Sequence, residues 1–196
     1  MSFELLNKVY SKKGLPEAIL KFGDISYLLP LFYFEILMKG SNQVLKNVVE
    51  LGTRGGESTV ALTTAVTELN EHNGTDIAVL SVDVDCQCLL DVRERLKTLN
   101  LDSCWSYVCC DSVDLIWDKP IDFLLIDTDH TEEQTRRELE LWSKKIVRGG
   151  TIWLHDTQST EGVRRAALAW LEKNRKDWEW FEVPVYAGLG WLRRRC

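Results

Sequence analysis

The sequence predicts an α/β fold built on a mostly parallel β-sheet, and three observations lead to this prediction. Short apolar runs alternate with helical segments from about residue 47 onward, which is typical of β-α-β crossovers. The run from Phe123 to Ile126 is apolar without alternation, as expected for a strand buried on both faces. Polar or glycine-rich turns follow these runs. We therefore expect a Rossmann-like, seven-stranded sheet with helices on both faces, an antiparallel C-terminal strand and an N-terminal helical cap.

Seven segments have the length and apolar content of strands, and they cover residues 47–51, 77–83, 104–110, 121–127, 151–155, 178–183 and 188–194. The last two are close enough in the chain to pair as an antiparallel addition. Between the earlier strands, apolar residues recur at the spacing of a helix with one buried face, first at Leu62, Ala65, Val66 and Leu69 and then at Leu89, Val92, Leu96 and Leu99.

Capping signals predict two further helices. Residues 131–134 form a capping box that opens with Thr131, in which side chains satisfy the free N–H groups of the first turn. The pair Gly149 and Gly150 is predicted to end this helix, just before the fifth strand. Ser159 or Thr160 is predicted to cap the next helix.

The first 46 residues lack this alternation and are predicted to form two or three helices, with a break at residues 14–16. We expect residues 1–46 to cap the sheet and residues 47–196 to form the core of a single domain. Tyr27, Phe32, Tyr33 and Phe34 could line the acceptor side of a site, but plain core packing is the favoured interpretation for most of them.

Composition and charge narrow the classes of function. The chain has 196 residues, 45% of them hydrophobic and 28% charged, with a net charge of -6. An acidic chain argues against a nucleic-acid partner, and no apolar run is long enough to span a bilayer. The six cysteines form no CxxC pair and the N-terminus does not resemble a signal peptide. We therefore expect free thiols in a cytoplasmic protein. The expected partner is a small molecule. The sequence leaves a homo-oligomer open.

The glycine-rich turn after the first strand reads ELGTRGGES, residues 50–58. Its glycines allow a tight turn and a close approach of the backbone to a ligand. A dinucleotide fingerprint would need glycine at the positions of Arg54 and Glu57, which argues against NAD or FAD. The turn fits an E/DxGxxxG pattern through Glu50, Gly52 and Gly56.

Polar residues also follow the next two strands, where ligands of an open parallel sheet bind. Asp83 is predicted to accept hydrogen bonds from both hydroxyls of a ribose, and Asp85 is the neighbour that could replace it. Asp111 and Ser112 are predicted to contact an adenine edge. A solvated loop acid is the alternative for Asp83.

The fourth and fifth strands end in LLIDTDHTEEQ and GGTIWLHDT. Adjacent parallel strands would bring Asp127 close to His155 and Asp156, and clustered carboxylates repel each other unless a cation or proton compensates them. Oxygen ligands suit Mg²⁺, Ca²⁺ or Mn²⁺, and a histidine ligand favours Mn²⁺ or a later metal. The alternative is that Asp127 caps a strand end and His155 is a packed, hydrogen-bonded side chain. Asp129 is interpreted as a solvated neighbour.

Together these motifs resemble class I S-adenosylmethionine (SAM)-dependent methyltransferases, in particular the O-methyltransferases of the catechol and macrolide-sugar types and the cephalosporin-hydroxylase-like group. The resemblance implies that SAM is the cofactor, that Asp127 and Asp156 bind a divalent metal such as Mg²⁺ or Mn²⁺, and that His130 is the general base. The catechol type has Asp-Asn in place of Asp156 and Thr157, and the macrolide-sugar type has Glu-Asp in place of His155 and Asp156. His155 is therefore a candidate for the third ligand.

The function expected from this resemblance is metal-assisted O-methylation of a small hydroxylated molecule, such as a sugar or a natural-product intermediate. Two alternatives stay open at this point. One is an oxidoreductase with a nucleotide cofactor on the same sheet, and the other is a non-catalytic module that binds SAM.

Overall fold

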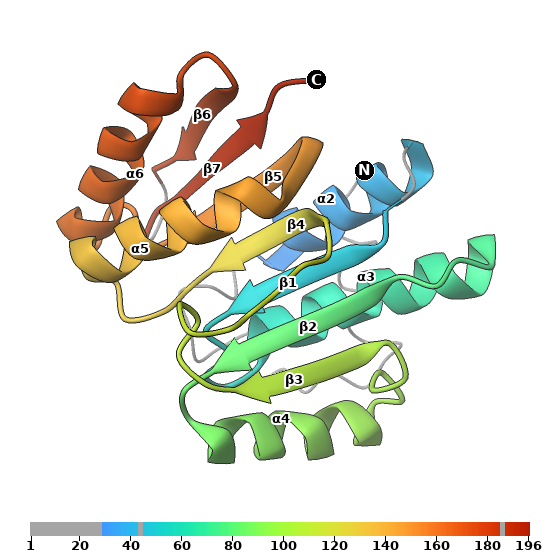
Figure 1. Cartoon of the computed structure of the whole chain (residues 1–196). Coiled ribbons are helices and arrows are strands. Elements are labelled where there is room, and N and C mark those ends of the chain that lie inside the picture. The colour runs from blue at the N-terminus through green and yellow to red at the C-terminus, as the bar shows by residue number, and fades with distance from the viewer. Residues whose placement is uncertain (1–28, 43–44, 185–186) are drawn as a thin grey trace.

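The computed structural model describes residues 29–42, 45–184 and 187–196 (Figure 1). Most of the predicted cap, including Tyr27 and the break at residues 14–16, lies outside these residues. The described chain forms one seven-stranded sheet in the order β3-β2-β1-β4-β5-β7-β6. The predicted α/β fold with a mostly parallel sheet is confirmed.

The strands are β1 (Asn47–Leu51), β2 (Ala78–Asp83), β3 (Trp105–Cys109), β4 (Ile121–Ile126), β5 (Ile146–His155), β6 (Trp178–Val183) and β7 (Leu189–Arg194). The first five strands run parallel, whereas β7 pairs antiparallel with both β5 and β6. The carboxyl ends of the five parallel strands therefore meet at one edge of the sheet, which is where ligands of such sheets bind.

The start of β5 differs from the prediction. Gly149 and Gly150 do not end the preceding helix but lie inside β5, which begins at Ile146. The helix ends at Trp142 and a short 3-10 turn follows it. The pairing of β4 with β5 shifts register here, and Gly149 has a φ of 75°. Glycine tolerates that backbone conformation, so the pair marks an irregularity within a strand and not a helix terminus.

Helices cover both faces of the sheet (Figure 1). They are α2 (Leu29–Asn42), α3 (Glu57–Asn73), α4 (Cys86–Thr98), α5 (Glu132–Trp142) and α6 (Glu161–Asn174). The core on one side joins α2, α3 and α4 to the sheet, and the core on the other side joins α5 and α6. Within β4, Phe123 and Leu125 face the first core while Leu124 and Ile126 face the second, as the unbroken apolar run predicts.

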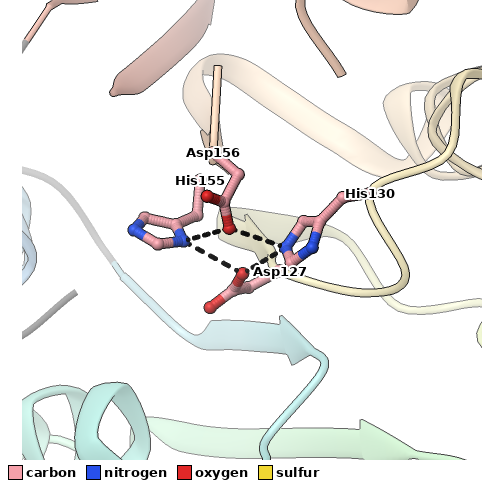
Figure 2. Close-up of side chains that lie close together, drawn as sticks. All are labelled: Asp127, His130, His155 and Asp156. Carbon is pink, nitrogen blue, oxygen red and sulfur yellow. Dashed lines mark hydrogen bonds and ion pairs between the residues drawn. The ribbon is translucent and has the colours of Figure 1, made fainter. Parts of the chain in front are cut away.

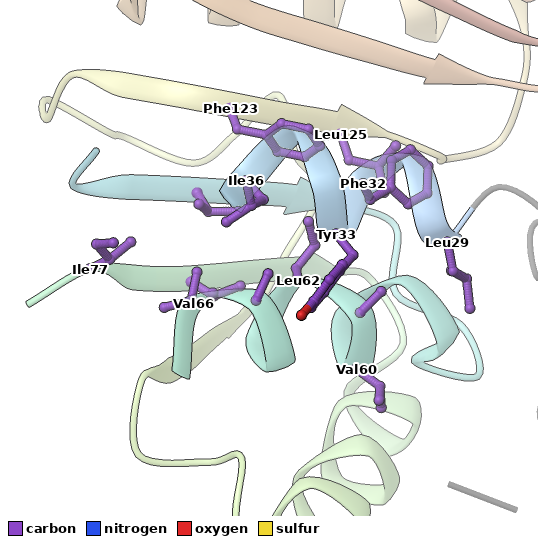
Figure 3. Close-up of a cluster of buried hydrophobic side chains, with 14 of the residues drawn as sticks. Leu29, Phe32, Tyr33, Ile36, Val60, Leu62, Val66, Ile77, Phe123 and Leu125 are labelled. Atoms are coloured by element: carbon purple, nitrogen blue, oxygen red, sulfur yellow. The ribbon is translucent and has the colours of Figure 1, made fainter. Parts of the chain in front are cut away.

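Figure 3 shows the first core, in which side chains of α2 pack against α3 and β4. Phe32 is fully buried, and its ring meets those of Phe123 and Trp153 edge-on, with centroids 6.3 and 5.6 Å apart. Tyr33 is also buried, and Phe34 packs against the same core. These three aromatic residues belong to the core, as the favoured interpretation has it.

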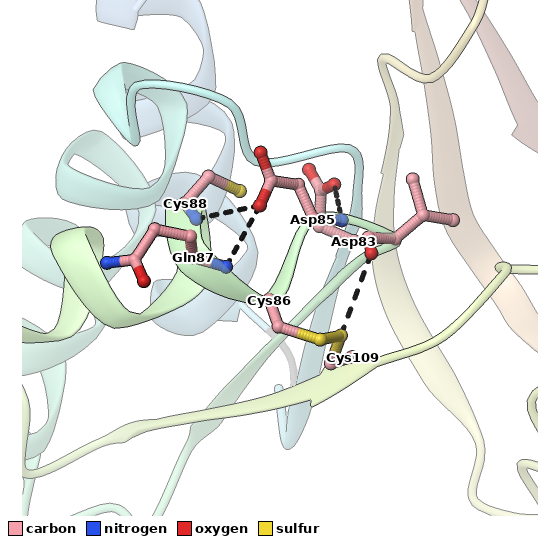
Figure 4. Close-up of a disulfide and its surroundings, with 7 residues drawn as sticks. Asp83, Asp85, Cys86, Gln87, Cys88 and Cys109 are labelled. Carbon is pink, nitrogen blue, oxygen red and sulfur yellow. Dashed lines mark hydrogen bonds between the residues drawn. A yellow bond between two sulfur atoms is a disulfide. The ribbon is translucent and has the colours of Figure 1, made fainter.

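The structure contains a disulfide between Cys86 and Cys109 (Figure 4), so the expectation of free thiols is wrong for these two residues. Cys86 opens α4 just after β2, and Cys109 ends β3, where it pairs with Asp83 of β2. The parallel pairing of β2 and β3 thus places the two Cα atoms 5.2 Å apart although 23 positions separate them in the chain. No described helix is both long and apolar enough to cross a membrane.

Candidate active site

A pocket of about 830 Å³ opens at the carboxyl ends of the parallel strands. Residues that follow each of the strands β1 to β5 line it. Four of the predicted cofactor residues are among them, namely Gly52, Asp83, Asp111 and Ser112. All candidate catalytic and metal-binding residues also line it, namely Asp127, His130, His155 and Asp156. Glu50 and Gly56 do not line the pocket.

The turn after β1 has glycine where no other residue fits. Gly52 has a φ of 85°, and a Cβ atom there would lie 2.0 Å from the carbonyl oxygen of Asp127. Gly56 has a φ of 79° and caps α3, and its missing Cβ would meet Val92 at 2.6 Å. Backbone conformation and close packing therefore both require glycine here, and Gly52 brings the turn directly against the end of β4.

Glu50 is hydrogen-bonded to the residues around this turn. Its carboxylate is fully buried and accepts hydrogen bonds from the hydroxyls of Ser58, Thr59 and Ser81, at 2.5, 2.7 and 2.7 Å. Burial raises the pKa of Glu50 to about 7, although these hydrogen bonds oppose the shift. Glu50 thus joins β1 to α3 and β2, and it shapes the cofactor end of the pocket without lining it.

Asp83 and Asp85 have different roles (Figure 4). One carboxylate oxygen of Asp83 accepts from the backbone N–H groups of Thr53 and Arg54, at 2.7 and 3.3 Å, and Asp83 lines the pocket. Asp85 is the N-cap of α4, and its carboxylate accepts from the backbone of Gln87 and Cys88. Asp83, and not Asp85, is therefore the carboxylate that lines the pocket.

The sequence pattern did not predict two residues beside Asp111 and Ser112, Gln134 and Glu138. Gln134 lines the pocket, and its side-chain amide donates to Asp111 and to Ser112 at 3.1 Å each. Glu138 is fully buried and accepts from Ser112 at 2.5 Å. Thr131 caps α5 as predicted by accepting from the backbone of Gln134. The sequence assigns Gln134 a role in the capping box of its own helix. Its contacts with the loop after β3 depend on the tertiary fold and have no signal in the sequence.

The four residues at the ends of β4 and β5 form a compact cluster (Figure 2). The Nε2 atom of His130 lies 2.9 Å from Asp127 Oδ1 and 2.9 Å from Asp156 Oδ2. The Nδ1 atom of His155 lies 3.2 Å from the same oxygen of Asp127 and 2.9 Å from that of Asp156. Nitrogen and oxygen atoms thus alternate around a ring. We name Asp127, His130, His155 and Asp156 the Asp-His cluster.

The charges in the Asp-His cluster shift the pKa values of its members. Burial disfavours the ionised carboxyls of Asp127 and Asp156, but hydrogen bonds from the two histidines outweigh it and lower both pKa values. Hydrogen bonds to the carboxylates raise the pKa of His130 to about 9. Burial opposes the same effect at His155, whose pKa is nevertheless raised to about 10. Without another cation, both imidazoles are therefore protonated at neutral pH and compensate the two carboxylates.

The backbone of this cluster is strained. His130 and Asp156 have φ values of 60° and 62°, in the left-handed region that non-glycine residues seldom adopt. Ser159 donates a hydrogen bond to Asp156 and helps to hold its carboxylate. Asp129 is exposed and accepts from Thr131, outside the cluster, as expected of a solvated neighbour. Strain of this kind is concentrated at functional sites.

The two histidines differ in exposure. The side chain of His155 is 3% exposed, whereas that of His130 is 31% exposed. The Nε2 atom of His155 is buried without a hydrogen-bond partner among the described residues. His130 is therefore the imidazole that a substrate in the pocket can reach.

The geometry of the Asp-His cluster fits a divalent cation. Its four donor atoms all lie within 4.8 Å of one another, and neighbouring donors are 2.9 to 3.2 Å apart. Adjacent ligands of an octahedral ion with bonds of about 2.1 Å lie about 3 Å apart. Two carboxylate oxygens with one or two imidazole nitrogens suit Mn²⁺ or a later transition metal better than Mg²⁺.

Comparisons with known proteins agree with this architecture. A model of the methyltransferase domain family matches residues 49–157, more than half of the chain. That stretch contains the glycine turn and the whole Asp-His cluster. The chain matches no curated protein sequence.

Three solved structures illustrate the likeness in fold. An O-methyltransferase from Bacillus cereus in complex with S-adenosylhomocysteine (SAH) matches at 17% identity and a TM-score of 0.66. The O-methyltransferase TomG from Streptomyces achromogenes, involved in tomaymycin synthesis and in complex with SAM, matches at 16% identity and a TM-score of 0.65. The SAH-bound methyltransferase PaMTH1 from Podospora anserina matches at 11% identity and a TM-score of 0.68. Each covers 100% of this chain, which in turn covers 92%, 92% and 97% of theirs. At these identities the likeness establishes the fold.

Proposed function

The chain belongs to the family of methyltransferase domains, and from this premise we propose that it transfers the methyl group of SAM to a hydroxyl oxygen of a small molecule with the help of a divalent metal. One observation carries the proposal: the glycine turn and the Asp-His cluster line the same pocket. Proteins of the same fold hold SAM or SAH, which supports SAM as the methyl donor. A nucleotide-dependent oxidoreductase and a non-catalytic module are not favoured by any of these observations.

The pocket offers SAM a site with two ends. Asp83 would accept hydrogen bonds from the ribose hydroxyls, and Gly52 allows the backbone to approach the ligand closely. Asp111 and Ser112 would contact the adenine. Because Gly52 also abuts Asp127, a cofactor held at the glycine turn would lie next to the Asp-His cluster.

Methyl transfer is an in-line displacement, in which an acceptor oxygen forms a bond to the methyl carbon while the bond from that carbon to sulfur breaks. The products are SAH and the methyl ether, and the hydroxyl proton must leave to a base. The protein therefore has to align the acceptor, exclude water and take up the proton. The partly exposed His130 is the group that can reach this proton.

Asp127, Asp156 and His155 would hold the divalent metal. A bound divalent ion supplies a Lewis acid that lowers the pKa of the acceptor hydroxyl. A protonated imidazole cannot accept a proton, and both carboxylates keep His130 protonated. A base role for His130 therefore requires that the negative charge of Asp127 and Asp156 be balanced in another way.

Four points stay predictions from the sequence. They are a sugar or natural-product hydroxyl as the acceptor, a cytoplasmic location, the absence of nucleic-acid and membrane partners, and a homo-oligomeric state. The disulfide between Cys86 and Cys109 argues against the predicted cytoplasmic location, since a reducing cytoplasm disfavours such bonds.

Calorimetry with SAH tests the cofactor. We expect the purified protein to bind SAH and the Asp83→Ala variant to bind it at least tenfold more weakly. Release of SAH from SAM in the presence of sugars, catechols and other hydroxylated molecules then tests the reaction. A protein that binds no SAH and releases none with any acceptor would contradict the proposal.

Binding of Mn²⁺ tests the metal site without relying on activity. Electron paramagnetic resonance of free Mn²⁺ should show one ion bound per chain, with the affinity at least tenfold lower in Asp156→Asn. Asp129→Asn is the matched control, because this exposed carboxylate lies outside the Asp-His cluster. Equal Mn²⁺ affinity in all three proteins would exclude the cluster as the metal site.

A further inference from the structure

We propose that Glu138 is a positioning residue that fixes the direction of two pocket hydroxyls, those of Ser112 and Thr128, and so sets the pocket's preference for a 6-amino purine. This inference rests on the proposed function, in which the adenine of SAM lies against Asp111 and Ser112. Glu138 itself does not line the pocket. It acts through Ser112 and Thr128, which line the pocket.

The contacts of Glu138 reach two loops that follow different strands. Its Oε1 atom accepts from the hydroxyl of Ser112 at 2.5 Å, in the loop after β3. Its Oε2 atom accepts from the hydroxyl of Thr128 at 3.0 Å, in the loop after β4. Both Ser112 and Thr128 line the pocket, and Thr128 directly follows Asp127 of the Asp-His cluster. One buried carboxylate of α5 thus holds a side chain at each end of the ligand site.

An ionised carboxylate can only accept hydrogen bonds, so it determines where the hydroxyl protons point. The proton of Ser112 is directed at Glu138, and its oxygen accepts from the side-chain amide of Gln134 at 3.1 Å. Asp111 presents an acceptor beside it, held by the backbone N–H of Val113 and by Gln134 at 3.1 Å each. The side chains of Asp111 and Ser112 therefore present acceptors to the base.

A surface of acceptors favours a ligand edge that carries N–H donors. The exocyclic amine of adenine offers such donors, whereas a 6-oxo purine turns a carbonyl oxygen toward the same place. Two facing acceptors cannot form a hydrogen bond, and a buried unpaired acceptor is costly. We therefore expect the protein to prefer SAH over its 6-oxo analogue, and Glu138 to be one source of that preference.

Glutamine at position 138 would change the polarity of this arrangement. An amide has one donor end, and a hydroxyl facing that end must turn and accept, which frees its proton for the pocket. Burial raises the pKa of Glu138 to about 7, against the effect of the hydrogen bonds from Ser112, Thr128 and Gln134. Binding should therefore be compared at pH 8, where the wild-type carboxyl is ionised.

The experiment measures the dissociation constants of SAH and of its 6-oxo analogue by calorimetry at pH 8. The preference for SAH is the dissociation constant of the 6-oxo analogue divided by that of SAH. We expect Glu138→Gln to reduce this ratio by about tenfold. Glu140→Gln is the matched control, because Glu140 lies on the same helix but is exposed and pairs with Arg136. The control should keep the wild-type ratio.

Ser112→Ala tests the same idea at the hydroxyl itself and serves if Glu138→Gln does not fold. It should lower the ratio by a similar factor. A ratio that stays at the wild-type value in Ser112→Ala and in any folded Glu138→Gln overturns the inference, as does an equal loss in Glu140→Gln. Failure of the wild-type protein to bind SAH at all would instead overturn the proposed function, so the two failures are distinguishable.

Discussion

The two ends of the pocket are held in place by different means. At the cofactor end, the backbone makes the main contacts. Gly52 adopts a left-handed conformation, and Asp83 accepts hydrogen bonds from the N–H groups of the turn. At the catalytic end, side chains hold one another, and two residues that are not glycine, His130 and Asp156, adopt the left-handed conformation.

This difference has a physical consequence. Backbone N–H groups do not titrate, so the donors of the glycine turn are unchanged by pH. The Asp-His cluster keeps its shape only while protons or a cation balance its two carboxylates. We therefore expect the cofactor end to determine affinity for SAM, and the catalytic end to determine turnover.

The strongest test of this division is Asp127→Asn. Loss of this carboxylate removes one partner from each histidine, and we expect turnover to fall by about 10³-fold, in the range of lost acid-base or metal assistance. Affinity for SAH, measured by calorimetry, should stay within about threefold. Asp129→Asn should lower turnover far less, since this carboxylate, although it lines the pocket, accepts hydrogen bonds from Thr131 alone among the described residues. A tenfold or larger loss of SAH affinity in Asp127→Asn would break the division.

Gly52→Ala should damage both ends, because Gly52 lies where they meet. A Cβ atom would lie 2.0 Å from the carbonyl oxygen of Asp127, on a backbone with a φ of 85°. We expect a loss of about 3 kcal/mol in the free energy of unfolding, together with weaker SAH binding.

Gly74→Ala is the matched control for this change. Gly74 also has a positive φ, 62°, but a Cβ atom there would meet nothing within 4 Å. The alanine should cost only about 1 kcal/mol, and urea unfolding measures both variants. Equal losses would show that backbone conformation, and not the contact with Asp127, makes glycine necessary at position 52.

Reduction of the disulfide should loosen the cofactor end alone. The bond ties the start of α4 to the end of β3, next to Asp83 (Figure 4). A cross-link over 23 positions stabilises a chain by roughly 3 kcal/mol in the loop-entropy account, which is an upper estimate. Dithiothreitol should therefore lower the melting temperature of the wild-type protein, whereas a Cys86→Ser/Cys109→Ser variant should not respond. If the wild-type curve is unchanged by the reductant, the disulfide contributes no stability.

Glu50→Gln has the smallest expected effect and appears in the pH dependence of stability. The pKa of Glu50 is about 7 in the folded protein, above its ordinary value of 4.5, so the folded state binds this proton more tightly. The resulting stabilisation is complete below about pH 4.5 and is lost as the pH rises through 7. Between pH 5 and 7 the variant should lose up to about 1.4 kcal/mol less per pH unit than the wild type. Parallel curves in urea unfolding would show that Glu50 titrates normally.

The sequence predicts regular elements well where one local pattern decides them. The bounds of β1 and β6 agree with the prediction, because each is a short apolar run between clear turns. The error at Gly149 and Gly150 arises from an irregular pairing with β4. A pairing of that kind depends on a partner strand far away in the sequence.

The candidate site shows the same limit. The acids at the ends of β4 and β5 were found because strand order and motif both point to them. Glu138 and the disulfide partners were missed, since each depends on a neighbour 23 or 26 positions away. Within its own helix Glu138 is one acidic residue among several, and only the tertiary fold shows that it is buried.

The position of β7 has a consequence for how the chain folds. β7 follows β6 in the sequence but lies between β5 and β6 in the sheet, and β6 pairs with β7 alone among the described strands. During synthesis, β6 leaves the ribosome before the strand that it needs, and β5 keeps an open edge for the same interval. An open edge is a template for pairing with other chains. Nascent chains that stop before residue 188 should therefore aggregate, while chains that continue through β7 close the sheet.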